Sequence, residues 1–210
     1  MPRSVGTAEF ENPREYNLLT REHRHYAGSY FVFGIIQSAP PPDALLVTHR
    51  GRDPERWGAY HDCFRICVRG RVTLQQLVAA FYTSWLFRIE RALLRVFLAI
   101  PSSDADAYAL ARGTRSTFSA WYVGARTATE LLMCDRYEQT RSWFRVAPDG
   151  DGGTEVCFGS AVAGRRRANA GFVMSPSFRV FLGFHLLYSQ LLLQAAARSL
   201  AAPGAGKSLL

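Results

Sequence analysis

The pattern of apolar positions predicts a long helix over residues 178–200. This segment contains no proline and carries only two charges, Arg179 and Arg198, one near each end. A helix that is apolar on nearly every side is buried, either in a protein core or in lipid. The interpretation of the rest of the chain depends on which of these two environments covers the helix.

Alternating residues predict a strand over 60–68. Phe64 and Ile66 alternate with Cys63 and Arg65, so the two pairs point to opposite faces of a sheet. Two further short strands and a loop are predicted upstream, at residues 30–36, 44–48 and 50–57 in that order.

One long helix is predicted over residues 73–97. Thr73 and Gln76 have the spacing of a capping box, and apolar residues recur every three or four positions after them. A second, short helix is expected at 103–112, where Gly113 can end it.

Four strands in close succession then predict an antiparallel meander. They are expected at residues 117–123, 127–134, 140–146 and 154–162, joined by turns at 124–126, 135–139 and 148–153. The last turn contains Asp-Gly and Gly-Gly pairs, which favour hairpins. A basic loop at 165–167 precedes the terminal helix, which Ser177 can cap. A sheet with one buried face needs cover on that face, and the terminal helix can provide it.

Composition narrows the class of protein only in part. The chain has 210 residues, is 48% hydrophobic and has a net charge of +8, carried almost entirely by arginine. Such a charge suits an anionic surface, but it also follows from a codon usage that favours arginine over lysine. No secretory signal is evident near the start, and the four cysteines lie in apolar surroundings, which is typical of reduced thiols. The expected location is therefore the cytoplasm.

The order of elements resembles the START and Bet v 1-like superfamily, also known as the SRPBCC or polyketide cyclase-like class. The resemblance extends over about residues 57–200 and includes three stretches, Tyr60-His61-Asp62-Cys63-Phe64, Arg141-Ser142-Trp143-Phe144 and Phe158-Gly159-Ser160-Ala161. These stretches look like a bacterial branch of the superfamily that is classed as a domain of unknown function. One clear strand before the long helix, where the family has two, is a departure from its pattern.

The resemblance implies an α+β fold of helix-grip type, a curved antiparallel sheet wrapped around a long C-terminal helix. The expected organisation is an N-terminal extension at 1–56, partly flexible, a helix-grip domain at 57–200 and a disordered tail at 201–210. Members of the superfamily enclose an elongated cavity that holds apolar molecules, and some of them cyclise or hydrolyse those molecules. The leading functional expectation is thus binding of a small apolar or amphipathic ligand between sheet and helix.

The candidate ligand-binding residues are drawn from three elements of this fold. Arg65 and Cys63 lie on one face of the first strand, and Arg65 could orient an anionic group or pair on a solvated face. Trp143 suits a cavity wall or a sheet core. His185 and Tyr188 lie three residues apart on the terminal helix and hence on one side of it.

Whether the protein is an enzyme stays open, because the chain contains no complete catalytic motif. In an alternative of polyketide-cyclase type, Glu130 or His185 moves a proton while Arg65 or Tyr188 stabilises an oxyanion. Glu130 could equally pair with Arg141 or Arg145 on the neighbouring strand. A further alternative is a structural or partner-binding domain with a filled core.

No metal, cofactor or nucleic-acid partner is expected. Cys63 and Cys67 are about 13 Å apart on a strand, too far to share a zinc ion bound at ~2.3 Å. Residues 180–197 lack a formal charge and just reach the length of a membrane span. Their polar residues, His185, Ser189, Gln190 and Gln194, make membrane contact the less favoured alternative. The oligomeric state is left undetermined.

Overall fold

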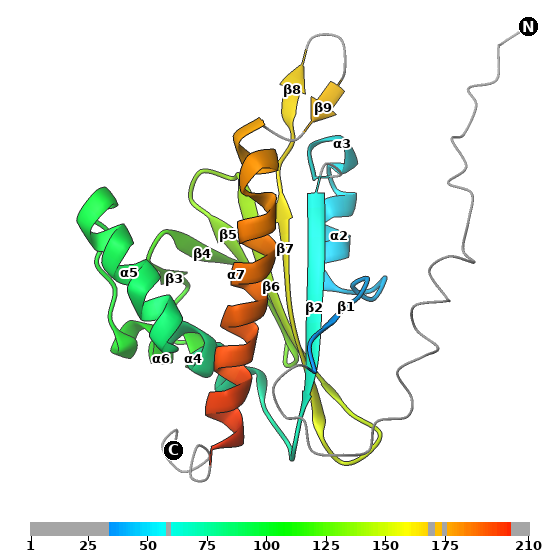
Figure 1. The fold of residues 1–210 in the computed structure, drawn as a ribbon, viewed down its shortest axis with the longest axis vertical. Helices are drawn as coiled ribbons and strands as arrows, with labels where there is room; N and C mark the ends of the chain where they lie inside the picture. The colour runs from blue at the N-terminus through cyan, green and yellow to red at the C-terminus, as the bar shows by residue number, and fades with distance from the viewer. Residues whose placement is uncertain (1–33, 58–59, 168–170, 174–175, 203–210) are drawn as a thin grey trace, which may run out of the picture. The chain divides into compact units, whose positions relative to one another are not determined.

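The computed structural model describes residues 34–57, 60–167, 171–173 and 176–202. A curved sheet of seven antiparallel strands runs in the order β1–β2–β7–β6–β5–β4–β3, with helices on both faces (Figure 1). The strands are β1 (Ile36–Gln37), β2 (Tyr60–Val68), β3 (Thr117–Phe118), β4 (Trp121–Arg126), β5 (Glu130–Asp135), β6 (Thr140–Pro148) and β7 (Thr154–Val162). A separate hairpin pairs β8 (Arg165–Arg167) with β9 (Gly171–Val173).

Six helices accompany the sheet in the described residues. They are α2 (Leu45–Gly51), α3 (Pro54–Trp57), α4 (Leu74–Tyr82), α5 (Trp85–Leu98), α6 (Asp104–Arg112) and α7 (Pro176–Ala201). Helices α4 and α7 cover one face of the sheet, here called the inner face, while α2 and α3 pack on the opposite, outer face (Figure 1). The α+β class and the sheet beneath a C-terminal helix are therefore as the sequence predicts.

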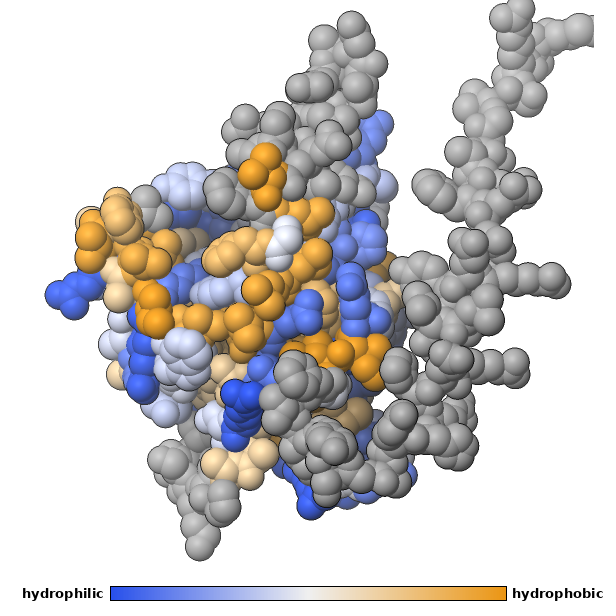
Figure 2. Space-filling model, in the orientation of Figure 1, coloured by the Kyte–Doolittle hydropathy of each residue, from blue (hydrophilic) through white to orange (hydrophobic). Residues whose placement is uncertain are grey.

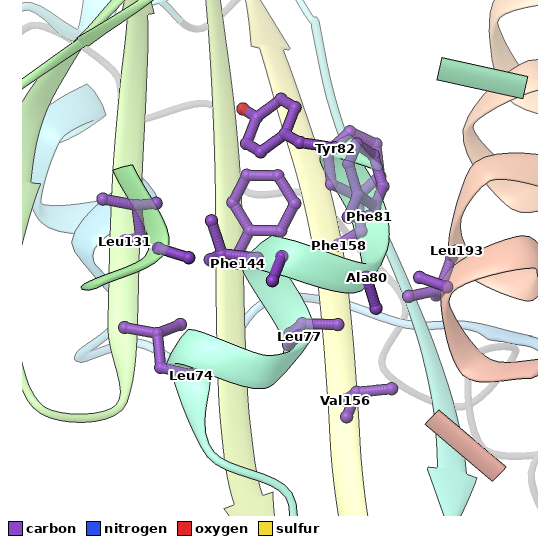
Figure 3. Packing of buried hydrophobic residues seen from close by; sticks show 14 of the residues in the cluster. Leu74, Leu77, Ala80, Phe81, Tyr82, Leu131, Phe144, Val156, Phe158 and Leu193 are labelled. Atoms are coloured by element: carbon purple, nitrogen blue, oxygen red, sulfur yellow. The ribbon is translucent and has the colours of Figure 1, made fainter. Parts of the chain in front are cut away.

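The larger hydrophobic core lies on the inner face. Leu77 and Phe81 of α4 pack against Phe144 and Phe158 of the sheet, and Leu193 of α7 closes the same cluster (Figure 3). The ring of Phe81 lies 4.7 Å from that of Phe158 and 4.8 Å from that of Phe144. Each fully buried side chain of this size stabilises the fold by about 1.5–3 kcal/mol, so this cluster is what holds α4 and α7 onto the sheet.

A second, smaller core lies between the outer face and α2. It contains Leu46 of α2, Trp57 of α3, and Cys63 and Trp143 of the sheet. Gly159 pairs with both Cys63 and Trp143 across the neighbouring strands. A Cβ atom at this glycine would come within 2.8 Å of the carbonyl oxygen of Asp62 and within 3.1 Å of the Trp143 ring. The absence of a side chain at position 159 thus makes room for the tryptophan.

The predicted long helix over 73–97 is wrong in one respect, because the chain breaks at Thr83 and Ser84 into α4 and α5. The expected capping box of Thr73 begins α4. Ser84 begins α5 by accepting a hydrogen bond from the backbone N–H of Phe87 at 3.2 Å. The break lets α5 leave the sheet while α4 stays packed on it (Figure 1).

The upstream predictions also need correction. The expected strand at 44–48 is the helix α2, and the expected loop at 50–57 ends in the short helix α3. Of the strand expected at 30–36, only residues from 34 onward are described, and β1 occupies just Ile36–Gln37. The expected basic loop at 165–167 is the strand β8.

The meander follows the prediction with shifted boundaries. Strand β7 has the predicted limits, whereas the expected turn at 124–126 lies inside β4, where the register shifts between Val123 and Ala125. Helix α7 begins at Pro176, so Ser177 lies within the helix rather than before it. In the part of the chain that the structure describes, no helix is both long and apolar enough to cross a membrane.

Candidate functional site

A cavity of about 160 Å³ lies on the inner face, bordered by α4, α5, α7 and the sheet. Its aromatic walls are formed by Phe81, Tyr82, Phe87, Trp121 and Phe158. Polar groups reach it from two sides. One group is centred on Asp62 of β2 and the other on Glu90 of α5. The two carboxylates differ in how many hydrogen bonds they accept.

Register places Asp62 beside Ser160 on the inner face. The two residues are direct partners in the antiparallel pairing of β2 with β7. Asp62 Oδ1 accepts hydrogen bonds from the backbone N–H and from the hydroxyl of Ser160, both at 2.8 Å. Asp62 Oδ2 accepts a third hydrogen bond from the hydroxyl of Tyr60 at 2.6 Å. Asp62 is almost completely buried, and a buried carboxylate is stable only with such compensation.

His185 of α7 completes this polar cluster. Its Nε2 atom lies 3.0 Å from Asp62 Oδ2 and 2.9 Å from Ser160 Oγ. The ring of Tyr60 packs edge-on against the imidazole, with centroids 5.7 Å apart. The four lone-pair sites of Asp62 are thereby taken by four protein donors.

The cluster does not have the geometry of a nucleophilic triad. The hydroxyl proton of Ser160 is donated to Asp62 Oδ1, so Nε2 of His185 must carry a proton to bond the carboxylate as well. In a triad one imidazole nitrogen faces the serine and the other faces the acid. Here a single nitrogen faces both, and it has no lone pair with which to remove the serine proton. The cluster is therefore a structural hydrogen-bond network rather than a nucleophilic site.

Glu90 presents a different electrostatic situation. Its Oε2 atom accepts a hydrogen bond of 2.5 Å from the hydroxyl of Tyr188, and no ion pair of Glu90 is found in the described residues. Burial raises the pKa of the Glu90 carboxyl, and the hydrogen bond from Tyr188 offsets part of that effect. Burial and the neighbouring carboxylate also raise the pKa of the Tyr188 phenol. Glu90 is thus a cavity carboxyl with spare acceptor capacity.

The sheet separates the five predicted ligand-binding residues into two groups. His185 and Tyr188 line the cavity, as does Ser160. Cys63 and Trp143 belong to the outer core beneath α2. Arg65 also points to the outer face and pairs with Glu155 at 3.1 Å. Of the predicted set, only the two residues on α7 meet in the cavity.

Glu130, predicted as a candidate general base, lies on the outer face and does not line the cavity. Its Oε2 atom accepts hydrogen bonds from the backbone N–H of Leu45 at 2.8 Å and from the Trp143 indole at 2.7 Å. Its Oε1 atom lies 4.0 Å from the Nε atom of Arg145, the alternative partner that the sequence suggests. Because Leu45 is the first residue of α2, Glu130 satisfies one of the N–H groups that a helix start leaves unpaired.

Asp62, Ser160 and Glu90 were not among the site residues predicted from the sequence. A signal for Asp62 was present, because it alternates in phase with Phe64 and so belongs to the inner face of the predicted strand. Ser160 shares the phase of Phe158 in the same way. Glu90 gave no such signal, because its position depends on the unforeseen break between α4 and α5.

No group of three or more histidine, cysteine or acidic residues is placed to hold a metal ion in the described ranges. Comparisons with models of protein families, with curated proteins and with solved structures gave no match.

Proposed function

We propose that the protein binds a small molecule with an apolar body and one hydrogen-bond donor in the inner cavity. The observation that carries this proposal is Glu90, a carboxyl that faces an aromatic-lined cavity and accepts from one donor among the described residues, the Tyr188 hydroxyl. A hydroxyl or amine of a ligand would supply a second donor. The cavity and its few convergent polar groups are the usual features of a ligand site.

The size of the cavity sets the scale of the ligand. An engineered protein cavity of about 150 Å³ accommodates benzene, and the volume here is about 160 Å³. The buried part of the ligand is therefore about as large as one aromatic ring. The resemblance to the helix-grip class supports the same proposal, because its members hold apolar molecules between the sheet and the terminal helix.

Simple one-ring probes test the proposal by titration calorimetry. Benzylamine and benzyl alcohol should bind more tightly than toluene, and benzoate should bind least because it would oppose the Glu90 carboxylate. Glu90→Gln keeps an acceptor for Tyr188 but removes the charge, and it should lower the affinity for benzylamine about tenfold, or about 1.4 kcal/mol. Failure of all four probes to bind would contradict the proposal.

Glu155→Gln is the matched control. Glu155, like Glu90, is a half-buried glutamate, but it pairs with Arg65 on the outer face of the sheet. Its substitution should leave the affinity for benzylamine unchanged. An equal loss in both variants would mean that the charge acts through the general field of the protein rather than through contact in the cavity.

A proton-transfer enzyme is the second candidate, and the position of His185 at the cavity favours it. Its Nε2 proton faces Asp62, so His185 could donate that proton to a substrate only if Asp62 gave up the hydrogen bond. Incubation in deuterium oxide with any molecule that co-purifies with the protein, followed by mass spectrometry of that molecule, separates the two candidates. Binding alone leaves its carbon-bound hydrogens in place, whereas proton transfer at carbon exchanges them for deuterium and raises its mass.

A further inference from the structure

Exposed apolar side chains gather on two helices of the fold. Of the eleven large hydrophobic residues exposed in the described part of the chain, nine lie on α5 and α7. Those on α5 are Trp85, Ile89, Leu93, Val96 and Phe97, and those on α7 are Val180, Phe184, Leu187 and Leu191. Figure 2 shows this apolar surface over both helices, and it is called the α5–α7 face below.

Helical spacing makes the α5–α7 face continuous along each helix. The exposed residues of α5 recur at intervals of three and four from Trp85 to Val96, and those of α7 do so from Val180 to Leu191. Their exposed fractions range from 43% to 78%, although the opposite sides of both helices are packed against the core. Contiguous apolar surface of this kind marks an interaction site.

In the described residues of α5 and α7, every exposed charged side chain is basic. Helix α7 contains no acidic residue, and the single acid of α5, Glu90, bonds Tyr188 at the cavity. Arg88, Arg95 and Arg198 are exposed beside the apolar residues. Within the described residues, Arg88 alone among them forms an ion pair, with Asp104. The whole chain has a net charge of +8. This combination complements an anionic partner, whereas a second copy would bring arginine against arginine.

We propose that the α5–α7 face lies on the surface of an anionic lipid membrane. A helix with an apolar side that includes tryptophan and phenylalanine, flanked by basic residues, typically lies in the plane of the membrane interface. Helix α5 has 14 residues and is about 21 Å long, too short to cross a ~30 Å hydrocarbon layer. Trp85 and Phe97 enter the interfacial zone, and Arg95 and Arg198 contact lipid phosphates.

This inference is independent of the proposed ligand. The cavity and the membrane surface share α5 and α7 but use different sides of them. Either could fail without the other.

Vesicle flotation of the full-length protein tests the inference. The protein should float with vesicles of 70% phosphatidylcholine and 30% phosphatidylglycerol at 0.1 M salt, and not with vesicles of phosphatidylcholine alone. Binding should weaken at 0.5 M salt because salt screens the arginines. The double variant Leu93→Glu, Val96→Glu should bind anionic vesicles at least tenfold less tightly. Equal binding to both kinds of vesicle, or no effect of the double variant, would overturn the inference.

Two controls keep the result specific. Ile36→Glu changes an exposed apolar residue of β1 that pairs with Arg65 and so faces the outer side of the sheet, and this variant should bind like the wild type. Both substituted residues of α5 are exposed, so circular dichroism should show a folded double variant. On anionic vesicles the tryptophan emission should shift to shorter wavelength, and Trp85→Phe should abolish that shift.

Sedimentation velocity separates the other occupants of this face. A wild-type dimer that the double variant converts to a monomer, without vesicle binding, would overturn the inference in favour of a second copy. A monomer that binds neither kind of vesicle would also overturn it.

Discussion

The Nε2 atom of His185 lies 3.0 Å from Oδ2 of Asp62 and so fastens α7 to β2 at the wall of the cavity. The two residues are 123 positions apart in the sequence. Asp62 also accepts hydrogen bonds from Ser160 and Tyr60. The contact with His185 therefore occupies the last acceptor site of the Asp62 carboxylate. The cluster therefore holds the helix in place, whereas Glu90 is the carboxyl that the proposed ligand would contact.

Substitution of Asp62 by asparagine should destabilise the protein by about 3 kcal/mol. The carboxylate accepts hydrogen bonds from four donors. In asparagine one acceptor oxygen is replaced by an NH₂ group, which is itself a donor and would face the donors of His185 or Ser160. The free energy of unfolding in urea measures the loss. Asp151→Asn, in the exposed β6–β7 turn, should change it by less than about 0.5 kcal/mol, and equal losses in the two variants would contradict the assigned role of Asp62.

Glu130→Ala should cost about 3 kcal/mol of stability but leave the benzylamine affinity unchanged. The change removes the acceptor for Leu45 and for Trp143, and buried donors without a partner cost about 1–3 kcal/mol each. Glu130→Gln retains an acceptor oxygen and should be milder. Urea unfolding and calorimetry together check this prediction. A loss of affinity in a folded Glu130→Gln protein would instead place Glu130 in the ligand site.

Gly159→Ala should destabilise the sheet by about 2 kcal/mol. The new methyl group would meet the carbonyl oxygen of Asp62 at 2.8 Å and the Trp143 ring at 3.1 Å, and backbone cannot yield as a flexible side chain does. Thermal unfolding gives the comparison. Gly150→Ala is the control, since no atom lies within 4 Å of its added Cβ, and it should unfold like the wild type.

The stability of the protein should fall as the pH drops below about 6.5, in part because of His49. Burial lowers the pKa of His49 from its ordinary value of 6.5, and the charge of Arg141 lowers it further. The neutral imidazole accepts a hydrogen bond from Arg141 Nε at 3.0 Å. The unfolded chain takes up a proton first, so the stabilisation is present above pH 6.5 and is lost as the pH falls through the lowered pKa.

Urea unfolding of the wild type and of His49→Gln at pH 7.5 and pH 5 isolates this contribution. The variant should lose less stability between the two pH values, because glutamine does not titrate. An identical loss in both proteins would show that other groups control the acid sensitivity.

Local sequence patterns were enough to predict the elements whose stabilising contacts lie within a few residues. The capping box at Thr73, the left-handed C-cap at Gly113 and the Asp-Gly turn before β7 all depend on neighbours within a few residues. Helix α2 is different. Its Leu-Leu-Val-Thr stretch suits a strand, yet Glu130, 85 positions away, accepts the first N–H of a helix there. Tertiary contacts of this kind override local preference.

The candidate site was predicted only where one element sufficed. His185 and Tyr188 share a side of a helix, which their spacing indicates. The approach of Asp62 to Ser160 depends on the register of β2 against β7, and the position of Glu90 depends on the turn that Ser84 starts. Neither the register nor the turn follows from hydrophobic spacing alone.

The order of synthesis has a consequence for the polar cluster at the cavity. The meander from β3 to β7 joins neighbours in the chain, so its hairpins can form soon after they leave the ribosome. Asp62 is translated long before its partner His185 on α7. Until α7 has been synthesised, the nascent chain cannot bury the Asp62 carboxylate. Chaperone dependence of newly made protein should therefore centre on the interval before α7 emerges.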